Sequence, residues 1–399
     1  MLNEKMYEYG SNSSVIRELF EYGKKRKQEI GEENVFDFSI GNPSVPAPEI
    51  VNETLENLIK NTNSTMLHGY TSAAGDFGVR ESITNYLNKK YATNFSANLM
   101  YLTVGAAASL TISLNAILNS GDEVVVISPF FPEYAVFVEK AGGVLKVVKS
   151  LEPSFQPDLT ALKNAITEKT KAIIINSPNN PTGVILSEET IFSMSKILKE
   201  KQQQFGNTIY ILSDEPYREL VYGDEQVPVI SKFYENTIIC YSFSKVLSLP
   251  GERIGYILVN SECVQAKMVY SAICGAGRAL GFVCAPALFQ YMLPNCLGKT
   301  ADLSVYKANR DLLYEKLSEL GYVLAKPQGA FYLFMKALGN DAKQFSELAK
   351  KYELLLVPSD SFGYEGYVRI SYCVSPEQIN RAIPAFAKLI TDYKNENKG

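Results

Sequence analysis

The stretch Ala172–Gly183 has the sequence AIIINSPNNPTG and decides the fold, because it joins a strand pattern to a loop held by prolines. Its apolar start is typical of a strand buried on both faces of a sheet. Two prolines then fix the loop, and its asparagines offer side-chain amides. Ligands in open α/β sheets bind beyond the carboxyl ends of the strands, so this loop is a candidate part of a binding site.

The same pattern recurs on both sides of this stretch, where short β-branched runs alternate with helical periods. Further apolar runs predict strands at Tyr101–Val104, Glu123–Ile127, Thr208–Leu212, Thr237–Tyr241 and Ile254–Val259. Helical stretches such as Ala106–Leu118 and Ser187–Leu198 lie between them. Strand, helix and strand repeated in this way predict an α/β domain with a mostly parallel sheet, which we place at residues 46–290.

The two ends of the chain follow a different pattern. Residues 13–31 predict an amphipathic arm helix, and the loop Gly41–Pro46 is too rich in proline to continue any element. Short strands are predicted at Ala330–Met335 and Tyr367–Tyr372, before a last helix. That helix is predicted to begin at Ser375-Pro376-Glu377-Gln378, with Ser375 and Gln378 forming a capping box. We therefore expect one smaller, discontinuous α+β domain built from residues 1–45 and 291–399.

Composition narrows the possible functions. The chain has 399 residues, a net charge of −4 and a single histidine, His68. Metal sites that need two or three histidines cannot form within one chain, and a Ser-His-Asp centre would need His68 as its base. We expect no metal site. The slightly acidic charge disfavours nucleic acid as a partner.

The same sequence predicts a cytoplasmic protein. The N-terminus has no signal-peptide pattern, and no segment approaches about 18 uninterrupted apolar residues, so we expect no contact with a membrane. The six cysteines lie in apolar stretches and form no C-x-x-C pair. That pattern predicts buried, reduced thiols.

Residues with possible chemistry follow several of the predicted strands. Gly105, Ala106 and Ala107 form a small-residue turn that opens a helix, where backbone N–H groups suit an anion. Other strands are followed by the aromatic loop around Phe131, by S-D-E-P-Y at 213–217, and by S-F-S-K at 242–245 with G-E-R-I-G at 251–255. Taken singly, each loop is also compatible with ordinary packing or a solvated surface charge.

The order and spacing of these loops resemble one family. The succession S-P-N-N-P-T-G, S-D-E-P-Y, S-F-S-K and G-x-R-x-G is similar to that of the class I, fold type I aminotransferases that depend on pyridoxal 5'-phosphate, such as those for aspartate and aromatic amino acids. The resemblance extends from Gly41 through H-G-Y-T-S-A-A-G at 68–75 to Y-V-R-I-S-Y at 367–372. It implies a large domain whose mostly parallel sheet has helices on both faces, a smaller α+β domain, and a homodimer.

The resemblance implies that Lys245 holds the cofactor as a Schiff base and then acts as the base. A lysine shuttles protons near neutral pH only if burial and nearby cations lower its pKa to roughly 7–8. Asp214 would face the pyridine nitrogen and keep the ring protonated, so that the ring can absorb electrons. Tyr217 and Asn180 would hydrogen-bond the ring hydroxyl, and Phe131 would stack on the ring.

The resemblance also implies where the phosphate and the substrate bind. Phosphate contacts would come from the turn Gly105-Ala106-Ala107, the hydroxyls of Ser242 and Ser244, the forked guanidinium of Arg253, and Tyr70 of the neighbouring subunit. Arg369 would bind the substrate α-carboxylate, assisted by Asn180 and the backbone at Gly41. His68 is predicted to be structural or to lie at the dimer boundary.

The activity that follows is a ping-pong transfer of an amino group from an L-amino acid to a 2-oxo acid. Carbon–sulfur β-lyases and aminocyclopropane-carboxylate synthases share the fold and remain the alternative. Lyases of this kind usually carry histidines where this chain has Asn179, Pro216 and Tyr217, which favours transamination. The substrate pair stays open, because Arg278 could read a distal carboxylate while the 25 Tyr and 20 Phe equally suit an apolar pocket.

Two unrelated alternatives fit less well. Ser242-x-x-Lys245 also matches the serine nucleophile pair of β-lactamases and penicillin-binding proteins, but the companion S-D-N and K-T-G elements are missing. The glycines of Gly275-Ala276-Gly277 suggest a dinucleotide fingerprint, which fails because position 280 is leucine.

Overall fold

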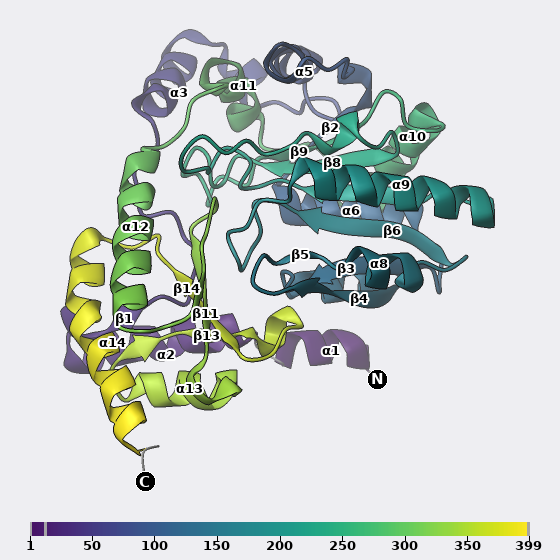
Figure 1. The fold of residues 1–399 in the computed structure, drawn as a ribbon. Helices are drawn as coiled ribbons and strands as arrows, with labels where there is room; N and C mark the ends of the chain where they lie inside the picture. Colours follow the sequence, from purple (N-terminus) through teal and green to yellow (C-terminus); the bar gives the residue numbers. More distant parts are fainter. Residues whose placement is uncertain (1, 12–13, 397–399) are drawn as a thin grey trace.

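An eight-stranded sheet forms the centre of the computed structural model, which describes residues 2–11 and 14–396 (Figure 1). The strand order is β2-β9-β8-β7-β6-β3-β4-β5. The strands are β2 (Met100–Thr103), β3 (Glu123–Ser128), β4 (Val144–Leu151), β5 (Gln156–Pro157), β6 (Thr170–Asn176), β7 (Tyr210–Asp214), β8 (Thr237–Ser242) and β9 (Gly255–Val259). From β4 through β3, β6 and β7 to β8 every pair is parallel, as predicted.

The edges of this sheet depart from the parallel arrangement. Strand β9 runs antiparallel to both of its neighbours, β2 and β8, and β5 runs antiparallel to β4. The sequence did not predict β4, because Val144, Val147 and Leu151 are exposed and lysines interrupt its apolar run. A strand near the edge of a sheet lacks the continuous apolar pattern that marks the central strands.

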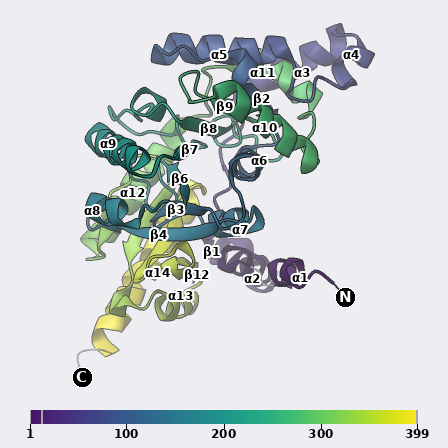
Figure 2. The ribbon, with the colours of Figure 1, turned by 90° about the vertical axis from the view of Figure 1, so that its right-hand side faces the viewer.

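Helices cover both faces of the large sheet, and alternate residues of β6 show how (Figure 2). Ile173 and Ile175 pack with α8 and α9, whereas Ala172 and Ile174 pack with α6, α7 and α10 on the opposite face. These helices are α6 (Ala106–Ile117), α7 (Glu133–Lys140), α8 (Leu159–Ala165), α9 (Glu188–Phe205) and α10 (Ala266–Ala279). The central strands are therefore buried on both faces.

A smaller antiparallel sheet stands beside the large one, with strand order β10-β11-β14-β13. Its strands are β10 (Leu324–Ala325), β11 (Tyr332–Lys336), β13 (Val357–Pro358) and β14 (Tyr367–Ser371). Next to it, β1 (Phe36–Asp37) pairs in parallel with β12 (Leu354–Leu355), so the two ends of the chain meet here. The boundaries between residues 1–45, 46–290 and 291–399 stay a prediction.

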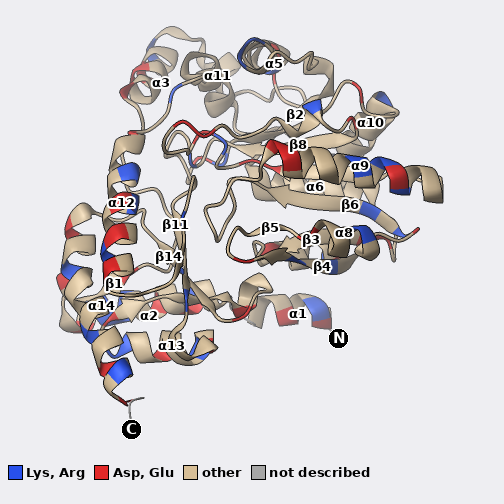
Figure 3. Cartoon of the chain, in the orientation of Figure 1, with Lys and Arg blue, Asp and Glu red and all other residues tan. Residues whose placement is uncertain are grey.

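Helices surround the small sheet and one edge of the large sheet. Those around the small sheet are α2 (Val15–Ile30), α12 (Leu303–Glu319), α13 (Ala342–Lys350) and α14 (Pro376–Glu396). Charges of both signs are spread over α12 and α14 (Figure 3). The remaining helices are α1 (Glu4–Ser11), α3 (Glu49–Asn61), α4 (Ser64–His68), α5 (Phe77–Tyr91) and α11 (Ala287–Cys296), of which α3, α5 and α11 lie at the β2 edge of the large sheet.

The predicted helix starts are confirmed, with one correction. Ser187 caps α9 by accepting a hydrogen bond from the backbone N–H of Thr190. Ser375 accepts one from the backbone N–H of Gln378 at 3.2 Å, which is half of a capping box. The Gln378 amide does not complete the box, because it donates to the carbonyl of Asp37 at 3.0 Å. Residue 13, where the arm helix was predicted to begin, lies outside the described residues.

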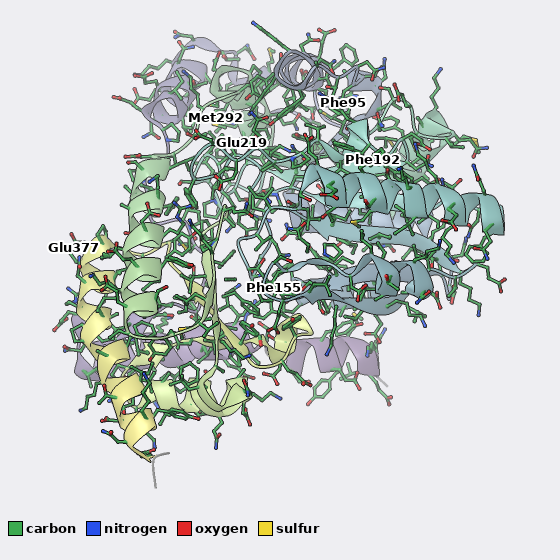
Figure 4. All side chains as sticks on the ribbon, viewed as in Figure 1. Phe95, Phe155, Phe192, Glu219, Met292 and Glu377 are labelled. Carbon is green, nitrogen blue, oxygen red and sulfur yellow. The ribbon has the colours of Figure 1, made fainter. Side chains whose placement is uncertain are left out.

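An aromatic cluster joins the two sheets. Phe155, labelled in Figure 4, precedes β5 of the large sheet and is buried against the small one. Its ring centroid lies 5.5 Å from that of Phe334 and 5.5 Å from that of Tyr367. Contacts of this kind fix the two sheets relative to each other, which a site between them requires.

The cysteines are only partly as predicted. All six are free thiols, and Cys240, Cys263, Cys296 and Cys373 are buried. Cys274 lies on α10 and Cys284 lies after the end of this helix, and both are half-buried.

Among the described residues, no helix has the length and apolarity needed to cross a membrane.

Candidate active site

A cavity of about 280 Å³ opens at the carboxyl ends of the central strands, between the two sheets. It gathers most of the predicted site residues, although they come from distant parts of the chain. The predicted residues that line it are Gly41, Ala106, Ala107, Phe131, Asn180, Asp214, Tyr217, Ser242, Ser244, Lys245, Arg253 and Arg369. The convergence of these groups on one concave site is typical of a small-molecule pocket.

Lys245 follows β8 and is partly buried in this cavity. Its Nζ donates a hydrogen bond to the carbonyl oxygen of Gly41 at 2.7 Å. Burial, reinforced by the guanidinium groups of Arg253 and Arg369 and opposed by Cys373, lowers the pKa of the Lys245 ammonium to about 8. A lysine with this pKa is partly neutral near physiological pH, so it can act as a nucleophile and as a base.

Asp214 ends β7 and is 5% exposed. Its Oδ2 accepts hydrogen bonds from the Tyr134 hydroxyl at 2.5 Å and from the Asn176 amide at 3.4 Å. Its Oδ1 is buried and has no partner. Burial raises the pKa of Asp214 to about 7, although the Tyr134 hydrogen bond opposes the rise. A buried, unpaired carboxylate oxygen is costly unless a ligand supplies a donor.

An anion-binding corner lies at the start of α6. Gly105 has a φ of +97°, and a Cβ at this position would lie 2.7 Å from Nη2 of Arg253. Arg253 donates to Ser244 Oγ at 3.3 Å, and the Oγ atoms of Ser242 and Ser244 are 2.7 Å apart. A helix N-terminus, two hydroxyls and a guanidinium are a favourable set of donors for a phosphate.

Arg369 lies on β14 and is 2% exposed, whereas a strand arginine is ordinarily at the surface. Its Nη1 donates to Asn180 Oδ1 at 3.1 Å, and its Nη2 donates to the carbonyl of Ser39 at 2.5 Å. Its buried Nε has no partner. A buried guanidinium with spare donor capacity is suited to binding a carboxylate.

These features together fit pyridoxal phosphate. The corner at Gly105 suits its phosphate, the unpartnered Oδ1 of Asp214 suits a protonated ring nitrogen, and Lys245 suits its aldehyde. Comparison with known proteins agrees, since residues 33–386 match the family model for aminotransferase class I and II. The chain belongs to this aminotransferase family.

Several aminotransferases are similar over nearly their whole length. An aspartate aminotransferase of Thermotoga maritima is 32% identical over 357 residues, which cover 88% of this chain and 90% of that protein. An aromatic-amino-acid aminotransferase of Thermococcus litoralis is 30% identical over 400 residues, covering 96% and 97%. A solved amino transferase from Eubacterium rectale is 53% identical, with a TM-score of 0.97 and coverage of 98% of this chain and 99% of that one.

These comparisons confirm three of the predictions. The chain has the fold type I architecture, it is a transaminase, and its cofactor is pyridoxal 5'-phosphate. The lyase alternative is not favoured, because the relatives carry aminotransferase names.

Some residues that contact the predicted site residues of this aminotransferase had no predicted role. Tyr134 and Asn176 hold Asp214, and the hydroxyl of Tyr332 lies 3.0 Å from that of Tyr217. Each had a signal in the sequence, because Tyr134 lies three residues after Phe131, Asn176 directly follows a predicted strand, and Tyr332 lies within one. Their roles depend on which neighbour each side chain meets, and sequence spacing alone does not specify that.

Three residues with predicted roles lie outside this cavity in a single chain of the aminotransferase. Tyr70 is 100% exposed and does not line it. His68 is exposed at the end of α4. Arg278 is exposed in the last turn of α10. Whether Tyr70 and Arg278 act across a subunit boundary stays a prediction.

Proposed function

We propose that this aminotransferase holds pyridoxal phosphate in the cavity between its sheets and transfers an amino group from an L-amino acid to a 2-oxo acid in two half-reactions. One observation carries the proposal: the amine of Lys245, the unpartnered Oδ1 of Asp214 and the unpartnered Nε of Arg369 belong to residues of a single cavity. Each provides what one part of the reaction needs, namely a proton carrier, an electrostatic partner for the ring, and a carboxylate anchor.

On the cofactor side, the residues bind the cofactor and orient its ring. The turn Gly105-Ala106-Ala107, Ser242, Ser244 and Arg253 would hold the phosphate, Phe131 would stack on the ring, and Tyr217 with Asn180 would bind its hydroxyl. When bound, the cofactor supplies an electron sink conjugated to the substrate Cα. The Asp214 carboxylate would keep the ring nitrogen protonated, and Tyr134 supports its ionised form by donating to Oδ2.

On the substrate side, the residues orient the Cα–H bond of the amino acid. Arg369 would bind the α-carboxylate, with Asn180 and the backbone at Gly41 assisting, so that the Cα–H bond is presented in one orientation. Lys245 Nζ would accept the Cα proton and return it later in the half-reaction. Its pKa of about 8 supports this role, because such an amine gives and takes protons near neutral pH.

The test is Lys245→Ala, compared with Lys232→Ala, which removes an exposed lysine that does not line the cavity. We expect Lys245→Ala to lose turnover and the visible absorbance of the covalently held cofactor, while Lys232→Ala keeps both. An unchanged absorbance in Lys245→Ala would disprove the assignment of the anchoring lysine. Pyruvate released from cystathionine without an oxo-acid acceptor would favour the lyase alternative instead.

We also propose a homodimer in which Tyr70 reaches the phosphate of the partner's site. The full exposure of Tyr70 supports this, as do two exposed apolar side chains near it, Met66 and Val283. The segment that contains Val283 lies beside the one that contains Tyr70, because the Cys284 N–H donates a hydrogen bond to the Ala73 carbonyl. Mixing Lys245→Ala with Tyr70→Ala subunits tests it. Hybrid dimers would contain one intact site, so activity should return on mixing, and failure to return would contradict a composite site.

Six unpaired cysteines suit a reducing compartment, so we propose that the enzyme works in the cytoplasm.

The substrate side chain is best identified by following the bound cofactor's absorbance with aspartate, glutamate, alanine, tyrosine and cysteine conjugates. If Arg278 of a second subunit reads a distal carboxylate, Arg278→Ala should lose activity on the dicarboxylates alone.

A further inference from the structure

Tyr332 lines the cavity on the small-sheet side. It begins β11, is 3% exposed, and pairs with Ser371 on β14, so it lies on the same face of the sheet as Arg369. It also packs against the loop before α3, because a Cβ at Gly41 would overlap the Tyr332 hydroxyl. A buried tyrosine in this place contacts groups from both sides of the site.

The hydroxyl of Tyr332 is directed at the cofactor side. It lies 3.0 Å from the hydroxyl of Tyr217, and the two rings meet edge to face with centroids 5.8 Å apart. Tyr217 is 5% exposed, so water does not readily replace this contact. A phenol that accepts a hydrogen bond becomes a stronger donor, because hydrogen bonds in a chain polarise one another. When Tyr217 donates to the cofactor's ring oxygen, Tyr332 can donate to Tyr217.

The ring of Tyr332 is directed at the substrate side. The guanidinium carbon of Arg369 lies 4.6 Å from the centroid of this ring. Arg369 is buried with no carboxylate paired to it among the described residues, so the aromatic faces beside it help to stabilise its charge. The second such face is that of Phe362, whose centroid lies 5.2 Å from the guanidinium carbon. The Tyr332 ring also limits where the guanidinium plane can lie, and therefore how a carboxylate meets it.

We infer that Tyr332 is a positioning residue that serves both ligands, with its hydroxyl strengthening Tyr217 as a donor to the cofactor and its ring orienting Arg369 for the substrate carboxylate. The inference rests on the proposed function, since it assigns work to a residue of that same site. The two contributions of Tyr332 can be told apart, because phenylalanine loses only the hydroxyl, whereas leucine loses the hydroxyl and the ring.

The experiment compares holoenzymes of Tyr332→Phe and Tyr332→Leu with a matched control. Tyr222→Phe serves as that control, since Tyr222 is an equally buried phenol that donates to the carbonyl of Ala330 and does not line the cavity. The first readout is the pH midpoint of the bound cofactor's visible absorbance. Tyr332→Phe should raise this midpoint by roughly 0.3 pH unit or more, because a weaker donor leaves the ring oxygen more basic. Tyr222→Phe should leave it unchanged.

The second readout is the dissociation constant of 3-phenylpropionate, a monocarboxylate probe, followed through the same absorbance. Tyr332→Phe should bind the probe within about 2-fold of the parent, whereas Tyr332→Leu should bind it about 5-fold more weakly because the aromatic face is lost. An unshifted midpoint in Tyr332→Phe, or equal probe affinity in the two variants, would overturn the inference. Absence of cofactor absorbance in the parent enzyme would instead overturn the proposed function, so the two failures are distinguishable.

Discussion

The two sides of the cavity are built in different ways. On the large-sheet side, Asp214 ends β7 and Lys245 follows the neighbouring parallel strand β8. Polar groups there contact other side chains, as in the pair Tyr134 and Asp214. On the small-sheet side, Arg369 comes from near the C-terminus and donates to the main chain near the N-terminus, at Ser39. Lys245 reaches the same segment at Gly41.

This difference indicates a division of labour. Under the proposed function, side-chain pairs on the large sheet tune the charge at the cofactor, so single substitutions there should change cofactor affinity and titration. Arg369, held by the main chain of Ser39 and the side chain of Asn180, would fix the position of the substrate carboxylate, so substitution of Arg369 should change substrate binding while leaving the cofactor in place.

Arg369→Ala should reduce kcat/KM by roughly 100-fold or more for every amino acid, because losing a buried charged partner costs about 3 kcal/mol. The cofactor's absorbance should stay at the parent level. Steady-state kinetics with several amino acids, beside an absorbance spectrum, check both parts. Arg369→Lys is the matched variant and should recover only part of the loss, since a lysine cannot make the forked contact. Loss of the cofactor in Arg369→Ala would break the proposed division.

Asp214→Asn should remove a pH dependence of stability from the cofactor-free protein. The pKa of Asp214 in the folded state is about 7, above the usual 3.8, so the folded protein holds this proton more tightly than the unfolded chain. Stability from this group is therefore greatest at low pH and falls as pH rises from about 4 to about 7. Between about pH 5 and about pH 7.5 the parent should lose about 2 kcal/mol more unfolding free energy than Asp214→Asn. Urea unfolding at the two pH values measures this, and parallel pH profiles would refute it.

Ser244→Ala should have the smallest effect. It removes one hydroxyl that contacts Arg253 and Ser242 in the anion-binding corner. Cofactor affinity should fall about 5-fold, corresponding to one hydrogen bond of about 1 kcal/mol, with little change in KM for the amino acid. Fluorescence titration of cofactor-free protein measures the affinity, and Ser271→Ala, on the exposed face of α10, is the control. A larger effect on KM than on cofactor affinity would contradict the assignment of Ser244 to cofactor binding.

How much the sequence predicts differs between the two sides as well. The parallel strands of the large sheet are uninterrupted apolar runs, and the residues after them share one edge, so their gathering was predictable. Strand β4 was not, because a half-exposed strand near the edge lacks such a run. Gln378 turned to Asp37 and not back to its own helix, because a tertiary partner outcompeted the local cap.

On the small-sheet side, sequence pattern alone places Arg369 on a strand but not in the interior. Its burial depends on Tyr332, Asn180 and Ser39 meeting around it from three distant segments. The resemblance to known aminotransferases supplied that role, whereas the contacts of Tyr332 and Tyr134 became visible only in the folded chain. Partners contributed through tertiary structure are what spacing in one sequence cannot specify.

A single half-reaction tests the central claim most directly. The holoenzyme is mixed with an accepted amino acid and no oxo acid, and both the cofactor's absorbance and the released products are measured. Transamination through Lys245 predicts that the absorbance changes once and that one equivalent of 2-oxo acid appears per subunit, without free ammonia, while Lys245→Ala shows neither. Continuous release of ammonia without an acceptor, or an unchanged reaction in Lys245→Ala, would contradict it.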